Sequence, residues 1–180
     1  MTDAHWRAAR WGVLAAALAM VALLVQDTPR ATPQTLGLFR VREVLDGDTV
    51  VLEGCNIYFK ARLAGIDAPE RGWKNVPGQP YARRSREYLS SLIRSRDVEV
   101  RQVALDDYNR PLVFLRCGDA DVNLRMVEQG MAEAYRGRTE FDVRPFFQAE
   151  ERARRQRLNI WSLKNYESPR RWRGRRRQRP

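Results

Sequence analysis

Three carboxylates stand where strands are expected to end, and functional sites usually lie at strand ends and in their loops. Asp48 lies in an Asp-Gly-Asp-Thr turn, and Asp67 and Glu70 flank an Ala-Pro pair. Carboxylate oxygens hold hard divalent cations, and a free carboxylate can take a proton from an attacking water molecule. We therefore interpret Asp48 and Asp67 as metal ligands and Glu70 as a general base.

Two arginines complete the set of groups that phosphodiester hydrolysis requires. Arg62 ends a strand-like stretch, and Arg110 follows a turn and opens the next strand. A guanidinium is planar and permanently charged, so it can bind two equatorial oxygens of a phosphoryl group as negative charge develops on them. We interpret Arg62 and Arg110 as clamps on that group.

Each of these residues also has an ordinary structural interpretation. The Asp46–Asp48 stretch is typical of a tight turn, and the Asp67–Glu70 stretch fits the capping box of a helix. Arg62 fits an exposed strand position, and Arg110 fits a turn arginine. Taken one at a time, the residues leave both interpretations open.

The composition excludes several kinds of enzyme. The 180 residues contain one histidine, His5, and two cysteines. His5 lies in an apolar N-terminal segment, so the rest of the chain has no histidine for a Ser-His-Asp triad or a histidine-ligated zinc site. The sequence has no phosphate-binding P-loop motif. Hydrolytic chemistry would have to come from Asp, Glu, Arg, Lys, Tyr and a bound metal ion.

The pattern of apolar residues predicts the elements that must position these side chains. Residues 39–44, 49–52 and 57–63 form a three-stranded meander, with an Asp-Gly hairpin signal after the first strand. Further strands are expected at 98–100 and 112–115, and helices at 81–94, 121–130 and 145–158. The pattern indicates a small α+β domain around a curled sheet, which at this length buries one core.

Positive charge is concentrated at the end of the chain. There are 33 Lys and Arg residues against 22 Asp and Glu, a net charge of +11, and seven arginines lie between Pro169 and Pro180. We predict an Arg-rich disordered tail over 167–180. Such a tail favours polyanions, so nucleic acid and anionic lipid are both candidate contacts, and a solvated tail without a partner is the alternative.

The N-terminus carries an unbroken apolar run, 11–25, preceded by two arginines. Its length suits a signal-anchor or the core of a signal peptide. We predict that 1–26 anchors the protein in a membrane with an exported periplasmic or extracellular domain; secretion after cleavage is the alternative. Residues 27–37 are expected to be a linker, and 38–166 the folded domain.

Four motifs in order are similar to the staphylococcal nuclease (thermonuclease) family. They are Val44-Leu45-Asp46-Gly47-Asp48-Thr49-Val50, Arg62-Leu63-Ala64-Gly65-Ile66-Asp67-Ala68-Pro69-Glu70, Asp107-Tyr108-Asn109-Arg110 and Leu158-Asn159-Ile160-Trp161-Ser162. The resemblance covers about residues 38–166. It departs from the family at Asn109, where glycine is common, and at Asp107, where a basic residue can contact the substrate.

The resemblance implies an α+β (mainly β) fold, a five-stranded OB-type barrel with three helices, here preceded by an apolar N-terminal helix. It implies Ca²⁺-dependent hydrolysis of DNA and RNA at the 5′-O–P bond, with little sequence specificity. The family's roles fall on these positions: calcium ligands Asp48, Asp67 and the backbone carbonyl of Ala68; general base Glu70; phosphate-binding Arg62 and Arg110; nucleotide contacts Tyr108 and Tyr135.

A further expectation, a disulfide, depends on the same barrel. Cys55 precedes one strand and Cys117 ends another. If these two strands run antiparallel, as the family's barrel implies, the cysteines approach each other and can form a disulfide in an exported protein. We expect a monomer. The rival function is a non-catalytic nucleic-acid-binding module on the same barrel, and a third is a membrane-tethered interaction protein whose tail binds lipid.

Overall fold

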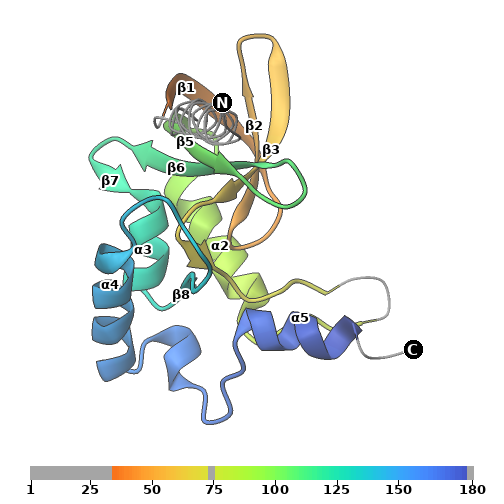
Figure 1. Cartoon of the computed structure of the whole chain (residues 1–180), viewed down its shortest axis with the longest axis vertical. Helices are drawn as coiled ribbons and strands as arrows, with labels where there is room; N and C mark the ends of the chain where they lie inside the picture. The colour runs from red at the N-terminus through yellow and green to blue at the C-terminus, as the bar shows by residue number, and fades with distance from the viewer. Residues whose placement is uncertain (1–33, 73–75, 178–180) are drawn as a thin grey trace, which may run out of the picture. The chain divides into compact units, whose positions relative to one another are not determined.

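The computed structural model describes residues 34–72 and 76–177. Five strands form a closed barrel in which neighbours run in the order β3-β2-β1-β5-β6, and pairing of β3 with β6 closes the ring (Figure 1). These strands are β1 (Gln34–Val44), β2 (Thr49–Gly54), β3 (Ile57–Leu63), β5 (Asp97–Leu105) and β6 (Pro111–Cys117). This arrangement confirms the predicted five-stranded barrel.

Three short strands lie outside the ring. β4 (Ile66–Asp67) pairs with β8 (Glu133–Ala134), and β7 (Ala120–Asp121) extends β6. The pairing of β4 with β8 matters for function because it places a predicted metal ligand, Asp67, opposite Glu133.

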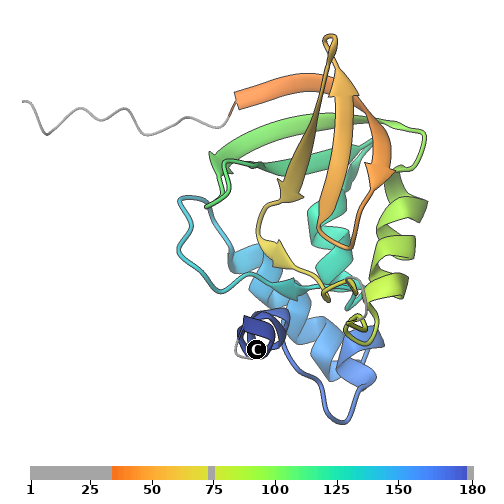
Figure 2. The ribbon, with the colours of Figure 1, turned by 90° about the vertical axis from the view of Figure 1, so that its right-hand side faces the viewer.

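The helices gather at one end of the barrel (Figure 2). They are α2 (Ala82–Ile93), α3 (Val122–Glu128), α4 (Arg144–Arg155) and α5 (Pro169–Arg177), with a 3₁₀ helix, η1, at Asn159–Ser162. The first three match the three predicted helices to within a few residues. α3 packs against both α2 and α4, so these three helices form one layer.

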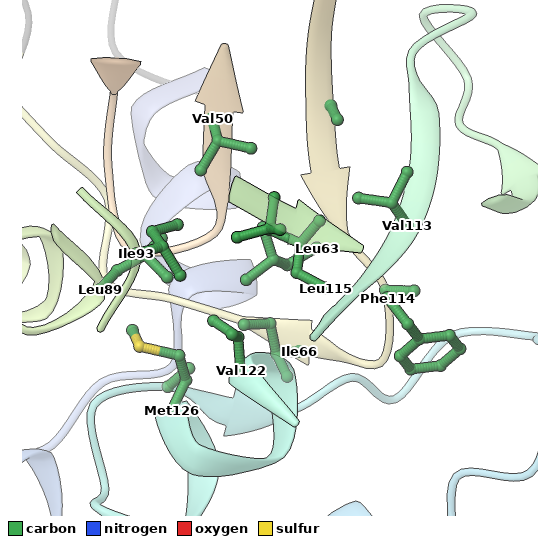
Figure 3. Packing of buried hydrophobic residues seen from close by; sticks show 14 of the residues in the cluster. Val50, Leu63, Ile66, Leu89, Ile93, Val113, Phe114, Leu115, Val122 and Met126 are labelled. Atoms are coloured by element: carbon green, nitrogen blue, oxygen red, sulfur yellow. The ribbon is translucent and has the colours of Figure 1, made fainter. Parts of the chain in front are cut away.

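Aliphatic side chains fill the space between the strands and the helices (Figure 3). Val50, Leu63 and Val113 point inward from three strands of the barrel, and Leu89 and Met126 meet them from α2 and α3. All five are at most 1% exposed. Burying a side chain of this size contributes about 1.5–3 kcal/mol, so this layer holds the strand ends in place.

A buried asparagine secures the closure of the barrel. The Asn123 side chain accepts a hydrogen bond from the Leu115 amide at 3.0 Å and donates to the carbonyls of Ala64 and Val113, each at 2.9 Å. These backbone groups belong to β6 and to the residue that follows β3. Because Asn123 opens α3, it ties that helix to the seam between the first and last strands of the ring.

The predicted disulfide between Cys55 and Cys117 is wrong, and the strand directions give the reason. β3 and β6 run parallel, with Arg62 opposite Leu112. Cys55 precedes the start of β3, whereas Cys117 is the last residue of β6, so the two cysteines lie toward opposite ends of the seam. Both thiols are free.

Two predicted boundaries are also wrong. Residues 34–37 were expected in a linker, but β1 already begins at Gln34. The tail 167–180 was expected to be disordered, but Pro169–Arg177 form helix α5. A serine followed by proline opens α5, and this pair is a common helix start.

The predicted signal-anchor or signal peptide, 1–26, lies outside the described residues. Over the ranges that the structure describes, no helix has the length and apolar character needed to cross a membrane.

Candidate active site

The two aspartates in the turn between β1 and β2 have different roles. Asp46 Oδ1 accepts a hydrogen bond from the Asp48 amide at 3.1 Å, so Asp46 performs the turn chemistry. Asp48 is 5% exposed and turns inward. A Cβ on Gly47 would lie 1.9 Å from Ser85 Oγ, so only glycine lets this turn pack against α2. The turn interpretation therefore applies to Asp46 and leaves Asp48 for the site.

Both carboxylate oxygens of Asp48 have partners. Oδ2 accepts hydrogen bonds from Arg62 Nη2 and from the Ala68 amide, each at 3.0 Å, and Oδ1 accepts one from the Thr49 hydroxyl at 3.0 Å. The Ala68 contact joins the loop after β4 to the turn before β2. The carboxylate is thus held rigidly, as a metal ligand or an arginine partner requires.

Arg62 bridges the two predicted metal ligands. Its Nη2 donates to Asp48 Oδ2 at 3.0 Å and to Asp67 Oδ1 at 2.8 Å, so two carboxylate oxygens converge on one cationic nitrogen. The side chain is 19% exposed, and the two carboxylates are 7% and 4% exposed. The charge of Asp48, with that of Asp67, raises the pKa of Arg62, which stays protonated. Arg62 is a partly buried ion-pair residue, not the exposed strand residue of the alternative.

The segment after β4 is a loop, so the capping-box interpretation of 67–70 is wrong. The next helix, α2, begins only at Ala82. The loop is instead fixed by Gln79, which is 5% exposed. Its side-chain Oε1 accepts a hydrogen bond from the Glu70 backbone amide at 3.1 Å, and its backbone amide donates to the Glu70 carbonyl at 2.8 Å. These two bonds hold the Glu70 backbone beside the site.

An arginine from the end of the chain binds the carboxylates of Asp67 and Glu70. Arg173 Nη1 donates to Asp67 Oδ1 at 2.8 Å and to Glu70 Oε1 at 2.6 Å, and Nη2 donates to Asp67 Oδ2 at 2.8 Å. The arginine run had been assigned to a disordered tail, so its role in the site was missed. The Ser-Pro pair before it was the signal that a helix begins there.

Arg110 lies at the same end of the barrel but faces another partner. Its Nε donates to Asp106 Oδ2 at 2.7 Å, and its amide donates to Asp106 Oδ1 at 2.9 Å. Asn109 takes the left-handed conformation, with φ of 57°, which asparagine tolerates better than most residues. The turn thereby presents Arg110 to a cavity of about 450 Å³ that Arg62 and Arg173 also line.

The two predicted nucleotide contacts border the same cavity. Tyr108 is 70% exposed and Tyr135 is 37% exposed. The Tyr135 amide donates to the Gly65 carbonyl at 2.9 Å, next to the pairing of β4 with β8. The Arg110 guanidinium lies 5.6 Å from the centre of the Tyr108 ring. Aromatic faces beside arginines are a common surface for bases and phosphates.

The donor set fits a hard divalent cation. Asp48 and Asp67 offer carboxylate oxygens and no nitrogen or sulfur, which suits Ca²⁺ or Mg²⁺. In the described part of the chain, no three acidic, His or Cys side chains are gathered as a ready cage. The two arginines instead neutralise the acids. Arg62 and Arg173 show that this cluster accepts positive charge.

Two further carboxyl groups near the site have raised pKa values. Burial raises the pKa of Glu133 to about 7, although the Tyr166 hydroxyl donates to its carboxylate at 2.9 Å. Burial and the charge of Asp48 raise the pKa of Asp46 to about 7. Neither residue was selected from the sequence. Glu133 becomes conspicuous only because β8 brings it opposite Asp67.

Comparison with known proteins gives a consistent picture. A family described as "Staphylococcal nuclease homologue" matches residues 60–163. An uncharacterized endonuclease of Haemophilus influenzae is 33% identical over 152 residues, which cover 84% of this chain and 81% of that protein. A micrococcal nuclease of Shigella flexneri is 34% identical over 142 residues, 74% and 78% of the two chains. A thermonuclease of Staphylococcus intermedius is 30% identical over 161 residues, 83% and 95% of the two chains.

The family match spans more than half of the sequence, and the Haemophilus and Shigella relatives are matched over most of both chains. The barrel with its helices is the OB-type fold that the resemblance implied. The chain belongs to the staphylococcal nuclease family.

Proposed function

We propose that this protein is a nuclease that hydrolyses phosphodiester bonds of DNA, RNA or both with little sequence specificity. The observation that carries the proposal is the convergence of Asp48 and Asp67 on one nitrogen of Arg62, beside Glu70. Relatives named as endonucleases, a thermonuclease and a micrococcal nuclease support it.

We further propose that the site works with Ca²⁺. Asp48, Asp67 and the backbone carbonyl of Ala68 would hold the ion, which would supply a positive charge next to the scissile phosphate. Two carboxylates and one carbonyl are ligands that calcium prefers, and the first two already accept cationic donors.

The chain's own residues supply the remaining chemistry. Glu70 Oε1 would take the proton of the attacking water, because it is 26% exposed and reachable from solvent. Arg62 would bind the phosphoryl oxygens from the buried side of the site, and Arg110 would bind them across the cavity. Tyr108 and Tyr135 would contact the nucleotide at the cavity rim.

Weak sequence readout would follow from the arginines and the two tyrosines that line the cavity. Aromatic stacking tolerates every base, and phosphate contacts carry no sequence information. A cavity of about 450 Å³ is within the size range of small-ligand sites.

The N-terminal apolar segment supports a second part of the proposal, that the folded domain is exported. Cell fractionation of the full chain would test it. A protein found with the soluble cytoplasmic fraction would contradict both the membrane-anchored and the secreted form.

The central test is a digestion assay on the full chain. Plasmid DNA and single-stranded RNA should be degraded with Ca²⁺, spared with a chelator, and degraded again when Ca²⁺ is restored. Glu70→Gln should lower the rate by about 10²–10⁴-fold with unchanged circular dichroism, because the amide cannot accept the proton. Glu151→Gln is the matched control, since Glu151 is an exposed residue of α4.

The assay separates the proposal from its rival. Tight binding of nucleic acid without cleavage in Ca²⁺ would show a non-catalytic binding module. A Glu70→Gln protein that cleaves at the normal rate would contradict the role of Glu70.

A further inference from the structure

Helix α5 places a permanent cation, the guanidinium of Arg173, on the carboxylates that the proposed nuclease would use to bind Ca²⁺. The Arg173 guanidinium spans both oxygens of Asp67 and one oxygen of Glu70 through three hydrogen bonds of 2.6–2.8 Å. Asp67 is 4% exposed at its side chain, Glu70 is 26% and Arg173 is 33% exposed. The contact is therefore largely shielded from water, where charge-assisted hydrogen bonds are strong.

Local contacts order the helix along its own length. The Ser168 hydroxyl accepts from the Arg171 amide at 3.3 Å at the helix start. Arg175 pairs with Glu167 at 2.7 Å and lies 4.7 Å from the centre of the Trp172 ring. Arg173 is thus delivered by an ordered helix rather than by a chance contact of an exposed side chain.

The segment before α5 is tied to the site as well. The Gln79 side chain, which holds the Glu70 backbone, also donates from Nε2 to the Glu167 carbonyl. The Tyr166 hydroxyl donates to Glu133, which lies opposite Asp67 in the β4–β8 pair. The same groups that position the site therefore position the segment that leads into α5.

The contact with Arg173 conflicts with both roles proposed for these carboxylates, metal binding by Asp67 and proton acceptance by Glu70. Both oxygens of Asp67 already face Arg173, so a divalent ion must compete for them. Glu70 Oε1 faces a donor with no lone pair, and an arginine does not give up its proton at physiological pH. While Arg173 stays in place, Glu70 cannot use this oxygen to take a proton from water.

We propose that α5 is an autoinhibitory helix in which Arg173 occupies the site as an internal counter-ion, and that Ca²⁺ binding requires Arg173 to withdraw. The inference rests on the proposed function, because it assigns a regulatory contact to the same carboxylates. The chain folds into a closed form whose acids are neutralised, and the helix leaves when calcium replaces its charge.

The surroundings of α5 provide a place for substrate to assist the withdrawal. Arg170 and Arg171 are exposed and line a cavity of about 620 Å³ together with Tyr135 and Arg154. Phosphates bound there would offer the helix another anionic partner. Inhibition should therefore be relieved by calcium and nucleic acid together more than by either alone.

Calorimetric titration of Ca²⁺ into the full chain, without nucleic acid, is the direct test. Arg173→Ala should bind Ca²⁺ about tenfold more tightly than the unchanged protein, because no internal cation competes. Arg173→Lys should fall between them, since lysine keeps the charge but loses the planar fork. Arg144→Ala is the control: it removes the same charge from an exposed position at the start of α4 that lines neither cavity, and it should leave the calcium Kd within about twofold.

Hydrogen exchange gives a readout that does not depend on affinity. Amides of 169–177 should exchange slowly in the unchanged protein, faster after Ca²⁺ is added, and fast in Arg173→Ala without Ca²⁺. Equal calcium Kd values for Arg173→Ala and the unchanged protein, or no calcium binding to either, would overturn the inference. So would slower exchange of the helix on adding Ca²⁺.

A digestion assay on the same proteins separates the two proposals. Arg173→Ala should be more active than the unchanged protein at limiting Ca²⁺ and equal to it at saturating Ca²⁺. Loss of activity at saturating Ca²⁺ would instead place Arg173 in the catalytic machinery and overturn the inference. If calcium displaces α5 but no variant cleaves nucleic acid, the proposed function fails and the autoinhibitory contact stands.

Discussion

Asp106 holds the guanidinium of Arg110: Nε lies 2.7 Å and Nη2 2.6 Å from Asp106 Oδ2. Burial acts to raise the pKa of Asp106, but hydrogen bonds from the Arg110 amide and side chain outweigh it and lower the pKa. The acid therefore stays ionised and fixes the direction of the arginine. Asp106 is therefore a positioning residue for Arg110. The sequence indicated Arg110 alone as a clamp and did not indicate its partner.

The first prediction concerns this pair. Arg110→Ala should lower kcat/KM for nucleic acid by about 10²–10³-fold, the loss typical of removing one transition-state donor. Asp106→Asn should lower it by only about tenfold, because the guanidinium remains but is less well directed. An Asp106→Asn protein as inactive as Arg110→Ala would contradict a positioning role.

The second prediction concerns Arg62, which neutralises two buried acids. Arg62→Ala should lower the free energy of unfolding by about 3 kcal/mol in chelator, because Asp48 and Asp67 lose a shared partner. Added Ca²⁺ should stabilise this variant more than the unchanged protein. Urea denaturation with and without Ca²⁺ measures both effects.

Arg40→Ala is the control for that experiment. Arg40 pairs with Asp97 at 3.5 Å on the surface, where both side chains are more than half exposed. Its removal should change stability by less than about 1 kcal/mol. Similar losses for the two variants would show that the Arg62 bridge contributes little.

The third prediction compares two glycines. Gly47→Ala should destabilise the protein by about 1–3 kcal/mol and disturb Asp48, because the new Cβ would meet Ser85 Oγ at 1.9 Å. Gly174→Ala should stabilise α5 by about 0.5–1 kcal/mol, since nothing lies within 4 Å of the added Cβ and alanine favours helix.

Thermal unfolding and calcium titration check both substitutions. A more stable α5 should also weaken calcium binding by Gly174→Ala, in the opposite direction to Arg173→Ala. Tighter calcium binding by Gly174→Ala would conflict with an inhibitory helix.

The fourth prediction is a pH dependence set by Glu133. Its pKa is about 7 in the folded protein, and it faces Tyr166, Arg136, Asp67 and Glu150. An unfolded glutamate has a pKa of about 4.3, so between these values the folded state holds the extra proton. The free energy of unfolding should therefore fall as pH rises from about 5 to 7, by on the order of 3 kcal/mol, and level off above 7.

Urea denaturation at pH 5 and pH 8 tests this sign. Glu133→Gln cannot ionise, so it should lose the part of the fall that Glu133 contributes, while the part from Asp46, whose pKa is also about 7, should remain. Glu151→Gln, an exposed substitution on α4, should keep the whole fall. A Glu133→Gln profile parallel to that of the unchanged protein would show that another group controls the pH dependence.

Much of the barrel could be predicted because its signals are local. The alternation in 57–63 is seen in β3, where Ala61 and Leu63 are buried, while Ile57 at the hairpin tip is 55% exposed. The Asp-Gly turn and the three central helices follow from spacing over a few residues. Asn109, which stands where the family commonly has glycine, takes a left-handed conformation, with φ of 57°.

What could not be predicted depends on contacts between distant parts of the chain. Arg173 lies 103 residues from Glu70 in sequence, and nothing local shows that they meet. The disulfide failed for the same kind of reason, because strand direction at the β3–β6 seam is a property of the closed ring. The arginine-rich composition of 169–177 favoured disorder, although these residues form a helix that a few contacts with distant residues hold against the site.

The parallel seam has a practical consequence for redesign. Because Arg62 stands opposite Leu112, the backbone ladder sets the offset between Arg62 and the strand that Arg110 precedes. The tip of the loop between β5 and β6, residues 107–109, can therefore be varied without moving Arg62, provided that Asp106 and Arg110 are kept. An insertion inside β6 would shift the whole register, so substrate preference should be engineered in the loop and the strand left intact.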